Sequence, residues 1–227
     1  GTATLDNVVA RELAPSPLMP KIHLKNLQGE MVIDRNGFNL TGTTDTNVTP
    51  VKFSWHENFS HVKTDNIRRI DLQTRLGDEE RSFLKVDDDR LYGFTETDIT
   101  LTTSVDGITN GTFFIDVTDA QLDLPSLRWN KVPGNPGKAA ISLVLKDGIP
   151  VRNPTFEFNS GQLHVRGNIE LDNRISVDAL VFELLEVGET RLSGRLNFKK
   201  DGGQEIHISA KYLDLRPYND APRINQD

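Results

Sequence analysis

Residue types that commonly carry chemistry are present in this chain, but their spacing matches no catalytic motif. None of the five histidines belongs to an H-x-H or H-E-x-x-H pattern, and there is no cysteine to act as a nucleophile or metal ligand. The G-x-S-x-G nucleophile elbow, the phosphate-binding loop of nucleotide hydrolases and the dinucleotide fingerprint G-x-G-x-x-G are also missing. The sequence therefore predicts a protein that is not an enzyme and that uses no cofactor.

Two groups of acidic residues are candidates for a metal site or for acid–base chemistry. Asp87, Asp88 and Asp89 are consecutive, whereas the oxygen ligands of a calcium loop alternate along the chain so that they converge. We therefore expect an exposed acidic loop without a metal. Asp116 and Asp119 form a carboxylate pair of the kind that hydrolyses glycosides, but acidic residues are too common here for this pair to be specific.

The two tryptophans offer a further link to carbohydrate chemistry. Trp55 and Trp129 each follow an alternating stretch and precede polar residues. Such a position suits either a core anchor or a platform on which a sugar ring stacks. We expect Trp129 to be largely buried and to hold residues 127–131 against a sheet. A carbohydrate-active β protein is kept as a third hypothesis.

Charge and composition exclude several classes of partner. The net charge is −7, and residues 78–98 hold eight acidic side chains against three basic ones. Nucleic acids and bare anionic membranes prefer the opposite sign, so both are poor partners. No apolar run approaches the length of a membrane span, and no leader precedes Gly1, so we expect any signal or anchor to lie outside this chain.

The elements that must position these side chains are strands, because apolar and polar residues alternate almost from end to end. In residues 163–171 (LHVRGNIEL) every odd position is apolar or glycine and every even position is polar. This period of two is typical of a strand with one buried face. Turn dipeptides such as Asn36-Gly37 and Asp106-Gly107 separate many of these stretches, which favours an antiparallel meander. The predicted strands cover residues 22–34, 38–44, 50–56, 68–76, 97–105, 112–124, 138–146, 154–158, 162–171, 174–186, 190–199 and 204–213.

The predicted fold class is mostly β: a curved, largely antiparallel meander sheet, either a half-open trough or sandwich-like, with one short helix. That helix is expected at residues 78–84, capped by Asp78, and a second short helix could cover residues 5–14. We divide the chain into an N-terminal arm (1–20), one β domain (21–219) and a C-terminal tail (220–227). Glycines inside strand patterns should mark bends or bulges. They are Gly42, Gly167 and Gly194.

Two segments resemble the AsmA-like proteins of the Gram-negative cell envelope, in particular the large members with a repeat-bearing region. Residues 116–139 (DVTDAQLDLPSLRWNKVPGNPGKA) read as a D-x-T-D-A strand followed by a W-x-K-x-x-G-x-P-G turn. Residues 211–217 (KYLDLRP) resemble the L-D-L-R-P ending of a repeat in that family, and residues 27–59 fit its opening pattern. The resemblance covers roughly residues 21–219.

This resemblance implies a sheet that curls around an apolar concave face and takes part in phospholipid transport between the inner and outer membranes. It implies a periplasmic location, with the parent protein tethered to the inner membrane by a segment outside this chain. The implied partners are a phospholipid or another acyl-chain ligand and adjoining repeats of the parent chain.

The residues expected to contact lipid are apolar positions of the C-terminal strands. They are Leu163, Val165, Ile169, Leu171, Leu192, Leu196, Phe198, Ile206 and Ile208. In a closed domain the same side chains would simply be core. The alternative function is therefore a structural or protein-interaction module that assists envelope assembly and binds no lipid.

Overall fold

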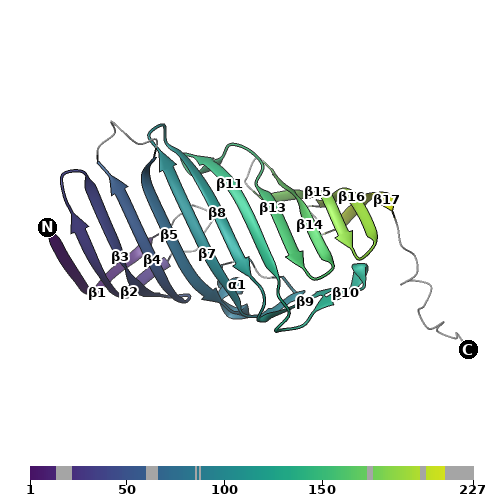
Figure 1. Cartoon of the computed structure of the whole chain (residues 1–227), viewed down its shortest axis with the longest axis horizontal. Helices are drawn as coiled ribbons and strands as arrows, with labels where there is room; N and C mark the ends of the chain where they lie inside the picture. The colour runs from purple at the N-terminus through teal and green to yellow at the C-terminus, as the bar shows by residue number, and fades with distance from the viewer. Residues whose placement is uncertain are drawn as a thin grey trace, which may run out of the picture.

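The computed structural model describes residues 1–13, 22–59, 66–84, 86, 88–172, 176–199 and 203–212, which form one large curved sheet and a small sheet (Figure 1). The large sheet, called the main sheet below, has the order β1-β2-β3-β4-β5-β7-β8-β11-β13-β14-β15-β16-β17, and β12 pairs with β11. The strands are β1 (Thr2–Leu13), β2 (Ile22–Ile33), β3 (Gly37–Thr46), β4 (Pro50–Asn58), β5 (Asn66–Leu76), β7 (Thr95–Ser104), β8 (Ile108–Asp116), β11 (Lys138–Lys146), β12 (Ile149–Pro150), β13 (Thr155–Ser160), β14 (Leu163–Leu171), β15 (Val177–Val187), β16 (Thr190–Phe198) and β17 (Gln204–Tyr212).

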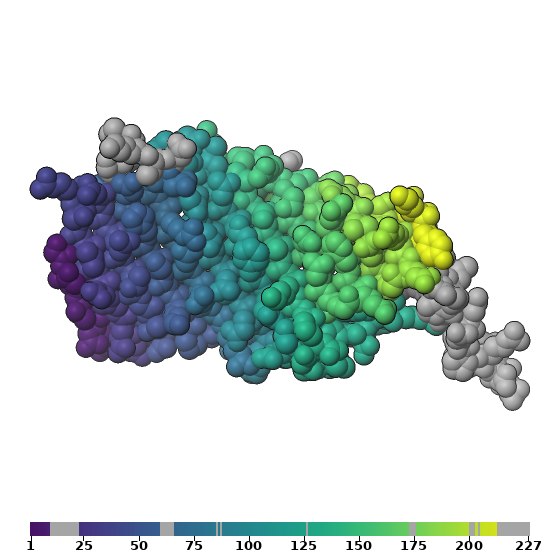
Figure 2. All heavy atoms as spheres, in the orientation of Figure 1, coloured from purple at the N-terminus to yellow at the C-terminus, as the bar shows by residue number. Residues whose placement is uncertain are grey.

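The small sheet interrupts this meander twice. It has the order β10-β9-β6 and consists of β6 (Leu91–Gly93), β9 (Ala120–Leu124) and β10 (Trp129–Lys131). The helix α1 (Asp78–Phe83) precedes β6, and a 3₁₀ turn at Pro125–Leu127 joins β9 to β10. In the space-filling view the sequence colours follow one another along the long axis, as a meander requires (Figure 2).

Within the described residues the predicted strands are confirmed, and so is the helix expected at residues 78–84, which spans Asp78–Phe83, with three corrections. Residues 174–175 and 213 of the predicted strands lie outside the described residues. Residues 112–124 were expected to be one strand but form two, because Val117–Asp119 turn the chain. There the Thr118 N–H donates to Asp116 Oδ1 at 2.8 Å. The helix begins after Gly77, whose N–H donates to the Glu80 carboxylate at 2.8 Å, so Asp78 is its first residue and not its cap.

The third correction concerns the N-terminus, where the expected helix at residues 5–14 is wrong. Thr2–Leu13 forms β1 and pairs with β2, so these residues belong to the sheet and not to a separate arm. β-Branched residues, including Val8 and Val9, favour a strand, and pairing with β2 supplies hydrogen bonds that a short isolated helix lacks. The residues predicted to end the helix, Pro15, Pro17 and Pro20, lie outside the described residues.

Glycines occur where neighbouring strands approach closely at sharp bends. A Cβ atom on Gly42 would lie 2.1 Å from the Gln28 carbonyl oxygen, and one on Gly167 would lie 1.9 Å from that of Val181. The strand register shifts at Gly167 and beside Gly194, as bulges do, whereas Gly42 lies opposite Gly29 without a shift. Because a neighbouring strand folds over the Cβ side of these glycines, that side is the inside of the curve.

The register also places apolar residues of successive strands on this inner side. One directly opposed row that crosses five strands is Leu72, Ile99, Phe113, Ile141 and Phe156. The row beside it, on the outer face, is Asp71, Thr100, Thr112, Ser142 and Thr155. Phe156 lies opposite Gly167, so the apolar row and the bend glycine share one face. We call this concave apolar face the trough.

Candidate functional site

Most of the trough is only half-buried. Leu72, Ile99, Phe113 and Ile141 belong to central strands, where a covered sheet would bury them, yet all four retain intermediate exposure. Among the described residues, the fully buried hydrophobic side chains are few for a chain of 227 residues. They are Leu27, Val117, Ala120, Val144, Leu163, Val165 and Ala179. The apolar face of the main sheet is therefore an open surface over much of its length and not a closed core.

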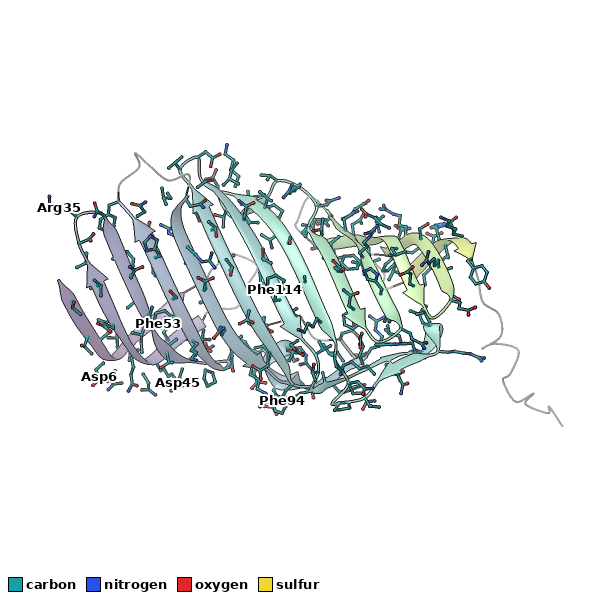
Figure 3. All side chains as sticks on the ribbon, viewed as in Figure 1. Asp6, Arg35, Asp45, Phe53, Phe94 and Phe114 are labelled. Carbon is teal, nitrogen blue, oxygen red and sulfur yellow. The ribbon has the colours of Figure 1, made fainter. Side chains whose placement is uncertain are left out.

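The outer face is polar and crossed by ion pairs. His164 lies 3.1 Å from Glu157 and 3.5 Å from Glu186, and Glu186 lies 2.6 Å from Arg191, so one series of polar contacts crosses β13, β14, β15 and β16. Phe114 is an exception: it is 57% exposed on the outer face, near the middle of the sheet in Figure 3. The contrast between the faces makes the trough the surface that needs a functional explanation.

The sequence-predicted contact residues lie on the trough side of β14, β16 and β17, but their exposure differs widely. Leu163 and Val165 are buried, at 1% and 9% exposure, and therefore serve as core. Ile206 and Ile208, at the β17 edge, are 58% and 60% exposed. The other five are half-buried: Ile169, Leu171, Leu192, Leu196 and Phe198. The prediction of one shared face is thus supported by the register, in which Ile169, Leu180, Leu196 and Ile206 lie in one row.

The small sheet carries Trp129 to the trough. The rings of Trp129 and Phe158 are 6.2 Å apart and nearly perpendicular at 88°, which is a favourable edge-to-face contact. Phe158 lies on the trough face of β13, opposite Val165. Trp129 is half-buried, so the expectation that it is largely buried was too strong.

A buried lysine stabilises this part of the chain. Lys131 is 1% exposed, and its ammonium group donates to the carbonyl oxygens of Thr118 at 3.0 Å, Ala120 at 2.8 Å and Val132 at 3.3 Å. Burial lowers the pKa of Lys131, while the negative charges of Asp116 and Asp119 oppose that shift. The residues of the W-x-K turn therefore have structural roles here. A strand pattern contains no signal for such a buried cation.

A second buried cation stabilises α1 in the same way. Arg81 is 4% exposed and donates to the carbonyl oxygens of Leu76 at 3.1 Å, Leu91 at 3.1 Å and Gly93 at 2.8 Å, and also to Asp78. Because Leu76 ends β5 while Leu91 and Gly93 belong to β6, this side chain joins the helix to both sheets. We call α1, β6, β9 and β10 together the clasp.

One ion pair lies inside the trough. In strands β3–β14 of the main sheet, the register puts only two described ionisable side chains on the trough face, Glu57 and Arg68. Arg68 donates from Nε to Glu57 Oε2 at 2.8 Å and from Nη2 to Oε1 at 3.0 Å, and Trp55 Nε1 donates to Oε2 at 2.9 Å. The Arg68 hydrogen bonds are the main reason that the pKa of Glu57 is lowered. Sequence reasoning missed this pair, although both charges occupy the apolar phase of consecutive strands.

The acidic candidates do not converge on a site. Asp116 Oδ1 accepts the Thr118 N–H, Asp119 lies 3.5 Å from Arg75, and Asp88 lies 2.5 Å from Arg90. Asp87 and residues 213–217, which carry the L-D-L-R-P pattern, lie outside the described residues. Within the described ranges, no group of three or more His, Asp or Glu side chains is arranged to hold a metal ion. No helix in those ranges has the length and apolar character needed to cross a membrane.

Comparison with known proteins gives no relative: no protein-family model, curated protein or solved structure matches the chain.

Proposed function

We propose that this chain is a periplasmic β domain of the AsmA-like type that handles phospholipid through its trough. The observation that carries the proposal is a continuous, half-buried apolar face, opposite a polar outer face, that runs across most of the main sheet. A chain with a net charge of −7 is otherwise highly polar. An exposed apolar surface of this extent on such a chain is typical of a binding surface for an apolar partner. The family resemblance of residues 116–139 supplies the location and the lipid class.

The dimensions of the sheet suit an acyl chain that moves. Thirteen strands lie side by side in the main sheet, and at about 4.8 Å per strand the trough is about 58 Å long. One leaflet of a membrane's hydrocarbon core is about 15 Å thick, which is the depth that one layer of acyl chains occupies. The trough is thus several times longer than one acyl chain. A bound acyl chain therefore has further apolar surface of the same kind beside it, onto which it can move.

The half-open shape also suits transfer. Full burial of a sixteen-carbon chain at about 0.8 kcal/mol per methylene would contribute about 13 kcal/mol and make release slow. A wall of half-buried side chains leaves part of the bound chain in water and lowers that free energy. A chain that slides along the trough exchanges one apolar contact for the next.

A structural or interaction module without lipid is the second candidate, and the sheet edges favour it. Among the described residues β1 and β17 each pair on one side only, which leaves backbone groups on the other side for an adjoining repeat or partner chain. Val9, Ile206 and Ile208 are more than half exposed near these edges.

Adjacent phenylalanines on opposite faces separate the two candidates. We expect mass spectrometry of the purified protein to detect phospholipid, and a fluorescent fatty acid to bind. Phe113→Glu, in the trough, should abolish both signals, whereas Phe114→Glu, on the exposed outer face, should preserve them. Circular dichroism should show that both variants fold.

If Phe113→Glu unfolds, Ile208→Asp at the exposed edge takes its place. Absence of lipid from the wild type, or equal loss in both variants, would favour the module without lipid.

A further inference from the structure

The Glu57–Arg68 pair lies at one rim of the trough, next to aromatic rings. This rim is the end of the strands that carries the β2–β3 turn with Arg35, opposite the end with Asp45 (Figure 3). The Phe38 ring lies 5.4 Å from that of Trp55, and the Arg68 guanidinium carbon lies 6.0 Å from the Trp55 ring centre. The Arg68 side chain is 42% exposed and that of Glu57 is 17% exposed, so a ligand can reach both groups.

The rim is polar where the trough below it is apolar. Arg68 lies opposite Thr103, and the Thr103 hydroxyl is 2.9 Å from that of Thr109 on the next strand. Two residues further along their strands, Ile70 and Leu101 lie opposite each other on the trough face. The polar row and the first apolar row are thus about 7 Å apart. A lipid whose chain contacts Ile70 and Leu101 would place its head group beside Arg68.

Stability alone does not explain a charged pair at this position. Solvent screens the pair on the side of Arg68, whose side chain is 42% exposed, and elsewhere in β3–β14 the trough face carries uncharged side chains among the described residues. The pair also retains unused bonding capacity. Among the described residues, Arg68 Nη1 has no hydrogen-bond partner, and the Glu57 carboxylate accepts three hydrogen bonds of about four possible.

We infer that Trp55, Glu57 and Arg68 form a binding site for a zwitterionic phosphate–ammonium head group, such as that of phosphatidylethanolamine. Arg68 donates to the phosphate oxygens from Nη1, while the Glu57 carboxylate and the Trp55 ring face the ammonium group. The pair itself carries no net charge, so it matches a zwitterion better than an anionic head group. This inference rests on the proposed lipid function of the trough and deepens it.

Calorimetric titration with matched ligands tests the site. The ligands are short-chain phosphatidylethanolamine, phosphatidylglycerol with the same acyl chains, a fatty acid, and water-soluble glycerophosphoethanolamine. We expect phosphatidylethanolamine to bind more tightly than phosphatidylglycerol. Arg68→Gln should weaken phosphatidylethanolamine binding roughly tenfold, because a charged hydrogen bond is lost, and should abolish the preference for phosphatidylethanolamine over phosphatidylglycerol. Arg68→Lys keeps the charge and should retain part of the preference.

The neighbouring residue provides the control. Arg69 pairs with Asp71 at 2.7 Å on the outer face, so Arg69→Gln removes a similar ion pair without touching the rim and should leave every affinity unchanged. If the fatty acid binds but the two phospholipids bind equally, or if Arg68→Gln and Arg69→Gln behave alike, the head-group site is wrong and the trough function stands. If neither fatty acid nor phospholipid binds, both proposals fail. Binding of glycerophosphoethanolamine alone would make the site a receptor for a soluble phosphate compound and would overturn its role in lipid transfer.

Discussion

The ion pair between Arg69 and Asp71 is typical of the polar outer face of the sheet. Arg69 donates to both carboxylate oxygens of Asp71, at 2.7 and 2.8 Å, and the Thr100 hydroxyl donates to the same carboxylate at 2.7 Å. These partners, Arg69 first, lower the pKa of Asp71. Because the pair is partly exposed, its contribution to stability is small.

Removing the Asp71 charge should change the acid stability of the protein. We expect Asp71→Asn to reduce the free energy of unfolding by less than about 1 kcal/mol at pH 6. The pKa of Asp71 is lower in the folded state, so the wild-type advantage is complete above the unfolded-state pKa of about 3.9 and is lost as the pH falls through the folded-state value. Urea unfolding at pH 6 and pH 3 measures this difference. An advantage that grows toward pH 3 would contradict the assignment.

At the scale of elements, the bend glycines let a regular meander become a trough. The inner faces of β14 and β15 meet at Gly167, where any side chain would collide with the Val181 carbonyl group. At Gly111, in contrast, an added Cβ would lie 3.1 Å from the end of the flexible Leu143 side chain. The first neighbour is backbone and cannot move without breaking the strand pairing, whereas the second can change its rotamer.

Alanine substitution at these two glycines should therefore differ sharply. We expect Gly167→Ala to lower the free energy of unfolding by about 3 kcal/mol or more, at the upper end for overpacking, and Gly111→Ala to lower it by less than about 1 kcal/mol. Denaturant unfolding of the two variants against wild type provides the comparison. Equal effects would show that the sheet at Gly167 has room to relax and that the glycine is not needed for the bend.

Elements of the main sheet could be predicted from sequence because their residues repeat a local pattern. The alternation in residues 163–171 fixes which side chains share a face, whatever the rest of the chain does. The burial of Arg81 and Lys131 in the clasp could not be predicted, since the turns bring together the carbonyl groups around them from separate parts of the chain. At β1 the helical expectation failed because the pairing with β2 is a tertiary contact that no local pattern in this segment indicates.

At the scale of the whole molecule, the trough follows from a sheet that curves but does not close. Closure would pair β1 with β17 and would seal the apolar face inside a barrel, as in small ligand-binding barrels. Here both remain edges among the described residues, so the same geometry that opens the trough also exposes strand edges. An open edge with apolar side chains pairs readily with another chain.

The β17 edge should therefore govern association between molecules. Sedimentation velocity of the wild type should show reversible, concentration-dependent association. Ile206→Lys with Ile208→Lys should keep the chain monomeric, because these changes replace the exposed apolar side chains of the edge by like charges. The control is His207→Lys on the same strand, since His207 lies opposite Arg195 on the polar face. A wild type that stays monomeric at every concentration, or equal association of both variants, would show that the β17 edge does not govern association.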